Sequence, residues 1–185
     1  MDNADYCLKS KFLDYFSKNN TMTFGGMYFR LYDSGRDDVV KNYMVEDWNK
    51  IFKNTTEDDL RDLSNCENVV ILLWCDIETD TPHGMLYFEE EYNHPFEVVF
   101  HGGTWNHSMK YHRDIFRSIV NILDFILSFK TSISTTCGID NNRADKFQES
   151  LCFEEIKRDE STMYKVLDKQ KYAESCFVKM MRLHN

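Results

Sequence analysis

The order of its strand-like and helical segments restricts the fold of this chain more than any other feature of the sequence. Three segments rich in large apolar residues, 69–77, 85–92 and 96–101, follow one another with only short turns between them. Such short connections predict an antiparallel meander. Residues 112–129 then repeat apolar side chains at helical spacing, and residues 132–139 alternate like a strand. A helix that crosses over to a further strand predicts a mixed sheet covered by helices.

The flanking segments extend this pattern. We expect a first strand over residues 27–33, a helix over 39–53 and a short helix that starts at Thr56 with a weak capping box. After the crossover strand we expect a helix within 141–153, a strand pair over 153–158 and 163–168, and a helix over 172–183. The predicted class is α/β (α+β): a mixed, mainly antiparallel sheet flanked by helices. Its parts are an N-terminal extension (1–26), the main domain (27–168) and a C-terminal helix packed on it (169–185).

Composition narrows the function classes. The 185 residues contain only 2 Pro and 7 Gly, without a linker-like stretch, which favours one domain. A net charge of -9 makes direct binding of nucleic acid improbable. The six cysteines show no paired spacing, and the sequence contains no apolar signal core and no stretch that could cross a membrane. We therefore expect reduced thiols in a cytoplasmic protein that is not secreted and does not contact membranes.

One late segment, NNRADKFQESLCF, carries a family resemblance. Asn141 is followed at fixed spacing by Ala144 and Phe147, and the segment closes with Leu151 and Phe153. Together with the element order, this spacing resembles the GCN5-related N-acetyltransferase (GNAT) superfamily over about residues 27–168. The resemblance implies a GNAT-like domain in which this helix flanks bound acetyl-CoA.

The segment departs from the family pattern at two positions. Gln148 stands where the family has a Tyr that often acts as general acid toward the leaving thiolate, and an amide does not donate a proton in this way. Cys152 replaces a Gly, which costs backbone freedom.

The loop before the long helix departs further. The family pattern is a basic or amide residue followed by spaced glycines that let the backbone approach a pyrophosphate. If Lys110 takes the leading place, the glycine positions hold Arg113 and Ile115; if His107 takes it, they hold Lys110 and His112. Positive charge at the helix start could compensate, or it could simply balance an acidic neighbourhood. The residues that we predict to bind the cofactor are Gly103, Lys110, His112, Arg113, Asn141 and Phe147.

Two residues are candidates for catalysis. The resemblance implies that Glu97, on the third meander strand, could deprotonate an amine, although it could equally be a solvent-facing strand residue. Tyr164 could replace the missing acid or be a half-buried strand aromatic.

Other polar clusters point less clearly to chemistry. The acidic run 89–91 could attract a cationic acceptor or be solvated surface. His101, His107 and His112 lack zinc-site spacing, so we expect loop and helix-cap histidines and no metal.

Two functions follow from the resemblance. The first is an acetyltransferase that moves acetyl from acetyl-CoA to an amine. The second is a non-catalytic GNAT-like module that binds a protein partner or larger assembly, as in phage head-assembly or virion-associated proteins. For a phage-encoded chain the location would be the host cytoplasm or the virion. The feature that distinguishes the two functions is the cleft between the strands predicted at 96–101 and 132–139. An open cleft favours the enzyme, and a cleft filled by Trp105, His112 or Arg113 excludes it.

Overall fold

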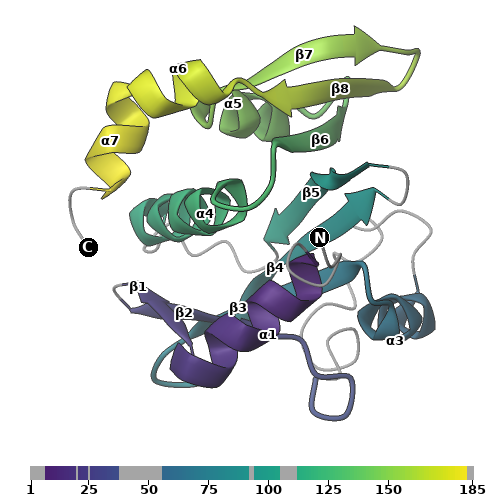
Figure 1. Ribbon diagram of the computed structural model, residues 1–185, viewed down its shortest axis with the longest axis vertical. Coiled ribbons are helices and arrows are strands. Elements are labelled where there is room, and N and C mark those ends of the chain that lie inside the picture. The colour runs from purple at the N-terminus through teal and green to yellow at the C-terminus, as the bar shows by residue number, and fades with distance from the viewer. Residues whose placement is uncertain are drawn as a thin grey trace.

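One eight-stranded sheet organises the chain (Figure 1). The computed structural model describes residues 7–19, 21–24, 26–37, 56–91, 94–104 and 112–182. The helix predicted over residues 39–53 lies outside these ranges. The strand order is β1-β2-β3-β4-β5-β6-β8-β7, and all neighbours are antiparallel except β5 and β6. The predicted mixed, mainly antiparallel sheet is confirmed.

The strands follow the apolar segments of the sequence. The predicted meander is β3 (Val69–Asp76), β4 (Pro82–Glu91) and β5 (His94–Thr104), and β1 (Met22–Phe24) and β2 (Met27–Leu31) extend the sheet beyond β3. The remaining strands are β6 (Ser132–Gly138), β7 (Phe153–Arg158) and β8 (Thr162–Leu167). The short strand β1 was not predicted from the sequence; it pairs with β2 through a tight connection at Gly26.

The helices are α1 (Leu8–Asn19), α3 (Glu57–Asn65), α4 (His112–Leu127), α5 (Asn142–Ser150), α6 (Lys169–Glu174) and α7 (Cys176–Arg182). The predicted capping box of α3 is present, since Thr56 and Asp59 exchange side-chain and backbone hydrogen bonds. The single C-terminal helix predicted over residues 172–183 is instead two short helices, interrupted at Ser175. Within the described ranges, none of the helices combines the length and apolar character that a membrane span requires.

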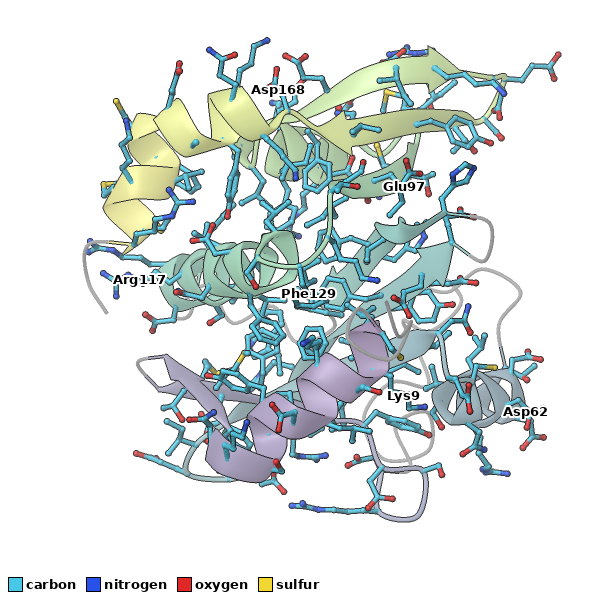
Figure 2. The ribbon with its side chains drawn as sticks, viewed as in Figure 1. Lys9, Asp62, Glu97, Arg117, Phe129 and Asp168 are labelled. Carbon is cyan, nitrogen blue, oxygen red and sulfur yellow. The ribbon has the colours of Figure 1, made fainter. Side chains whose placement is uncertain are left out.

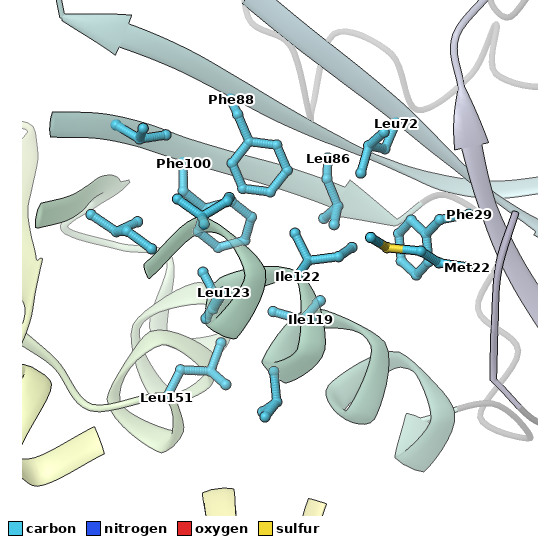
Figure 3. Close-up of a cluster of buried hydrophobic side chains, with 14 of the residues drawn as sticks. Met22, Phe29, Leu72, Leu86, Phe88, Phe100, Ile119, Ile122, Leu123 and Leu151 are labelled. Carbon is cyan, nitrogen blue, oxygen red and sulfur yellow. The ribbon is translucent and has the colours of Figure 1, made fainter. Parts of the chain in front are cut away.

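The main core lies between one face of the sheet and the helices α1 and α4 (Figure 3). Phe88 and Phe100 stack with ring centroids 5.3 Å apart and face Ile122 and Leu123 of α4. Phe12 of α1 stacks on Phe88 at 5.9 Å. Part of the segment predicted as an N-terminal extension therefore contributes directly to the core.

The opposite face of the sheet is covered by α3 over β3, where Leu60 packs with Leu73 and Met85. Side chains alternate between faces along a strand, so β5, β6 and β8 also present a set of residues on this side. We call this set the open face. Its members range from half-buried to exposed: Glu97, Val99, His101, Ser134, Thr136 and Tyr164.

Candidate functional site

The two parallel strands separate partway along their length. β5 and β6 pair over four residues, from Glu97 opposite Ser132 to Phe100 opposite Thr135. Beyond that point β5 continues to Thr104 along β4, and β6 continues along β8, but the two no longer pair with each other. We call this the strand divergence, formed by residues 101–104 and 136–138. Backbone groups that lose a strand partner need other hydrogen bonds, so the divergence can accept an extended chain that carries amides.

A helix N-terminus lies at the open end of the divergence. α5 follows β6 after three residues, so it begins at the carboxyl end of β6, whereas α4 follows β5 along the chain across residues outside the described ranges. Unpaired N–H groups and the helix dipole favour an anion at such positions. The Asn141 side chain already caps α5 by accepting a hydrogen bond from the Ala144 N–H at 3.1 Å. The side-chain oxygen of Asn141, a predicted cofactor-binding residue, is therefore already engaged within the protein.

The predicted basic residues are only partly within the described chain. Arg113 is exposed in the first turn of α4, so it does not fill the divergence. Its neighbour Asp114 accepts a hydrogen bond from Arg117 at 3.5 Å. Lys110, like His107 and Trp105, lies outside the described residues, and His112 is described only as the first residue of α4.

Phe147, also predicted to touch the cofactor, packs against a neighbouring helix. Its ring lies 4.9 Å from the ring of Phe116 on α4, and Phe116 in turn lies 5.1 Å from Phe177 on α7. Both Phe116 and Phe147 sit about one turn inside their helices. This contact links α4, α5 and α7 and restricts the space between the first two.

Gln148 reaches from α5 to the inner end of the divergence. Its Nε2 donates hydrogen bonds to Thr135 Oγ1 at 3.1 Å and to the Thr136 carbonyl oxygen at 3.2 Å. Only the NH₂ end of an amide can donate to a carbonyl, which determines the orientation of the side chain. The residue is 6% exposed, and its Oε1 has no hydrogen-bond partner among the described residues. A buried acceptor therefore remains available where the family has a proton donor.

The two predicted catalytic residues share the open face but differ in position. Glu97 is exposed in the first parallel pair, four residues before His101, which corresponds to about 13 Å along a strand. Figure 2 shows Glu97 on β5 and Arg117 on α4. Tyr164 lies opposite Thr136 across the β6–β8 ladder, and its hydroxyl donates to Asp159 Oδ2 at 3.0 Å. That hydrogen bond raises the pKa of Tyr164.

The remaining predicted features are placed as follows. Gly103 lies opposite Met85 on the β4 side of the divergence. The acidic run splits between the two faces of β4: Glu90 pairs with the buried Lys130, while Glu89 accepts the hydroxyl of Tyr87 at 2.7 Å. The run is therefore not a uniform solvated patch.

His101 is the residue that sequence reasoning missed. It was the last residue of the strand predicted over 96–101 and was weighed only as a metal ligand or a loop histidine; in the structure β5 continues past it to Thr104, and His101 follows directly after the last pair with β6. Its ring lies 6.0 Å from that of Tyr87, the residue opposite it on β4. Burial lowers the pKa of His101, and Glu89 opposes the shift. The available signal was the alternation of side chains along a strand, which puts His101 on the same face as Glu97 and Val99. Among the described residues, no cluster of His, Cys, Asp or Glu could hold a metal.

A depression of about 490 Å³ lies elsewhere, between α5, β7 and α6, and its three cations are paired. Lys165 pairs with Asp145, Lys171 with Glu154, and Arg158 with Glu155. With its cations already neutralised, this depression is a poor anion site.

The chain matches no protein-family model and no curated protein sequence. It is similar in structure to an apo form of FdhC, a nucleotide-linked sugar GNAT, with a TM-score of 0.63 and 15% identity over 83% of this chain and 93% of that one. A ribosomal-protein-S5-alanine acetyltransferase from Vibrio fischeri matches with a TM-score of 0.64 and 11% identity over 79% and 94%.

A probable acetyltransferase of the GNAT family from Chromobacterium violaceum matches with a TM-score of 0.66 and 9% identity over 84% and 88%. These similarities extend over almost the whole length of the compared chains. The chain therefore has the fold of the GCN5-related N-acetyltransferases.

Proposed function

We propose that the chain transfers an acetyl group from acetyl-CoA to an amine at the strand divergence. The observation that carries this proposal is the separation of β5 and β6 after Phe100 and Thr135, at the end of β6 where α5 begins. Ligands of open α/β sheets bind at the carboxyl ends of strands, where neighbouring connections part. The chemistry supplied by acetyl-CoA is an activated acetyl thioester.

Features of the divergence fit the cofactor. An extended arm with amides can pair with strand edges that lack a partner. The buried Gln148 Oε1 offers an acceptor for an N–H group. Lys110, His112 and Arg113 would favour the pyrophosphate at the start of α4, and Gly103 would leave room for the arm beside β5. Asn141 and Phe147 would border the cofactor through the α5 N-terminus and the ring pair with Phe116.

The acceptor would approach from the open face, where Glu97 and Tyr164 also lie. Because Gln148 cannot donate a proton to a leaving thiolate, that proton must come from another group or from solvent. Tyr164 remains the proposed side-chain donor, once its hydroxyl leaves Asp159. Similar structures are named as a nucleotide-linked sugar GNAT, a ribosomal-protein-S5-alanine acetyltransferase and a spermidine N-acetyltransferase chimera, which supports an amine as the class of acceptor.

A second candidate is a non-catalytic GNAT-like module, possible for a phage assembly or virion protein, whose surface binds another protein. The observation in its favour is Gln148, which replaces an acid and uses its amide to hold β6. In this case the divergence is a remnant of the fold, and CoA does not bind.

A thermal-shift titration tests the choice. Acetyl-CoA and desulfo-CoA would be compared with adenosine 3′,5′-bisphosphate, and a ligand at about 100 times its Kd adds about 2.7 kcal/mol of apparent stability. A saturable shift that is lost in Lys110→Ala/Arg113→Ala supports the cofactor site. The control Arg61→Ala/Lys179→Ala removes the same charge from exposed positions on α3 and α7 and should keep the shift. No shift at millimolar acetyl-CoA overturns the enzyme and leaves the binding module.

A further inference from the structure

We propose that His101 is the catalytic base that takes a proton from the amine acceptor, an inference that rests on the proposed function. His101 is the first residue of β5 beyond its last pair with β6. Its side chain is on the open face, opposite Tyr87, so it borders the divergence from the side on which the acceptor would approach. Neither predicted catalytic residue has this position.

The His101 imidazole is held in place by a ring contact and not by hydrogen bonds to described residues. The ring centroids of His101 and Tyr87 are 6.0 Å apart, which holds the imidazole beside β4. The Tyr87 hydroxyl is engaged by Glu89 Oε2 at 2.7 Å, so it does not occupy an imidazole nitrogen. Among the described residues, neither nitrogen of His101 has a hydrogen-bond partner, and the side chain is only half-buried. A lone pair is therefore free to accept a proton.

The surroundings keep this imidazole neutral. Burial lowers the pKa of His101, while the charge of Glu89 two residues along β4 partly opposes that shift. On the same face of β4, the pKa of Tyr87 is raised, mainly by burial, so Tyr87 stays neutral, and burial lowers the pKa of His83. Glu91 of β4, Glu97 of β5, Tyr164 of β8 and Lys157, whose Nζ lies 5.4 Å from the Tyr164 ring, are further titratable groups on this side of the sheet. A neutral histidine is the form that a general base requires.

The other candidates are less well placed for this step. Glu97 is about 13 Å further along the same strand, away from the divergence. The Tyr164 hydroxyl donates a hydrogen bond to Asp159, which raises the pKa of Tyr164. Because the hydroxyl therefore keeps its proton, it is a poor proton acceptor.

The step balances without a further reactant. His101 accepts a proton from the ammonium form of the acceptor, and the freed amine lone pair forms a C–N bond with the acetyl carbonyl carbon. The C–S bond breaks with its electron pair on sulfur. The amine nitrogen loses its second proton to solvent. The thiolate takes a proton from Tyr164, the donor proposed above, and the proton on His101 restores the Tyr164 hydroxyl through water. The products are the N-acetylated amine and the free thiol.

The test compares His101→Gln with His94→Gln, because each replaces a histidine of β5 by an amide and His94 is exposed at the start of the strand. Release of thiol from acetyl-CoA would be followed with spermidine and with a peptide that begins with alanine, between about pH 5 and 9. We expect His101→Gln to lose kcat on the order of 10²-fold, a typical contribution of a general base, with the acetyl-CoA thermal shift unchanged. His94→Gln should stay within a few-fold of wild type.

Two readouts separate catalysis from structure. Wild-type activity should persist below the ordinary histidine pKa of about 6.5 before it falls, and this acid limb should disappear in His101→Gln. Added imidazole should restore part of the activity of His101→Ala. A wild-type rate and pH profile in His101→Gln would overturn the assignment while the proposed reaction stands. If wild-type protein shows no acetyl-CoA shift, or acetylates neither amine, the proposed reaction itself fails and the assignment fails with it.

Discussion

The Gln148 side-chain amide donates a hydrogen bond to the Thr136 carbonyl oxygen, across 3.2 Å. Thr136 is the first residue of β6 beyond its pairing with β5, and it still pairs with Tyr164 of β8. A side chain of α5 thus bonds to the β6 backbone at the position where β6 has left β5. This part-buried contact gives the Thr136 carbonyl a hydrogen-bond donor at the inner end of the divergence.

Replacing this amide should destabilise the fold. Gln148→Leu removes both donors and leaves the Thr136 carbonyl without this partner, so we expect a loss of about 1–3 kcal/mol in the free energy of unfolding. Urea denaturation measures it. The control Gln170→Leu makes the same change at an exposed position on α6 and should shift stability by less than about 0.5 kcal/mol. Equal effects of the two changes would contradict the role of Gln148.

Replacing Cys152 by glycine, the residue of the family pattern, should stabilise the fold. Its φ of 65° is in the left-handed region, where a side chain is strained and glycine is not. We expect Cys152→Gly to raise the free energy of unfolding by about 0.5–1 kcal/mol. Cys66, which follows the end of α3 with a φ of -66°, provides the opposite case. Cys66→Gly should destabilise, and stabilisation in both variants would remove the backbone explanation.

Breaking the ion pair between Lys130 and Glu90 should lower the free energy of unfolding far more than breaking a surface ion pair. The Lys130 side chain is 0% exposed and Glu90 is 11% exposed, whereas Lys171 and Glu154 are 63% and 46% exposed. Lys130→Met leaves a largely buried carboxylate without its cation, and we expect a loss of about 3–5 kcal/mol. Lys171→Met should cost less than about 1 kcal/mol. The double variant Lys130→Met/Glu90→Leu should recover much of the loss; no recovery would show that packing, not charge, dominates.

Acid should destabilise the protein partly through His101. Burial lowers its pKa in the folded state, so the unfolded chain binds the proton more readily. The free energy of unfolding therefore falls as the pH drops below about 6.5, and this contribution is complete only above that range. His101→Gln should flatten the decline between about pH 7 and 5, as measured by denaturant unfolding. His94→Gln, at the exposed start of the same strand, should leave it unchanged.

The sequence was sufficient for the architecture because its apolar periodicities were strong. The meander, the crossover helix and the final strand pair all appear near the predicted positions. β1 was missed because three residues are too few for a periodic signal. The C-terminal helix was predicted as one because no glycine or proline marks Ser175. The local sequence pattern gives only a weak signal for such short strands and helices.

The site was less predictable because it depends on where strands part. Residues were assigned from family spacing, which located Gln148 but not its bond to Thr136. The predicted strand ended at His101, although β5 continues through Gly102 and Gly103, and His101 was weighed only among the histidines that could bind a metal. Register between distant strands is set by packing of the whole sheet, and no short segment encodes it.

The four-residue parallel seam divides the sheet into two leaves. One leaf is β1 to β5 and the other is β6, β8 and β7, and the strand ladder joins them only from Glu97–Ser132 to Phe100–Thr135. α4 spans both leaves on the core side, so it acts as a clamp across the seam. A small rotation of one leaf against the other would widen the divergence without breaking either antiparallel ladder. Amides of β6 that face the seam should consequently exchange with solvent before those at the centre of β3.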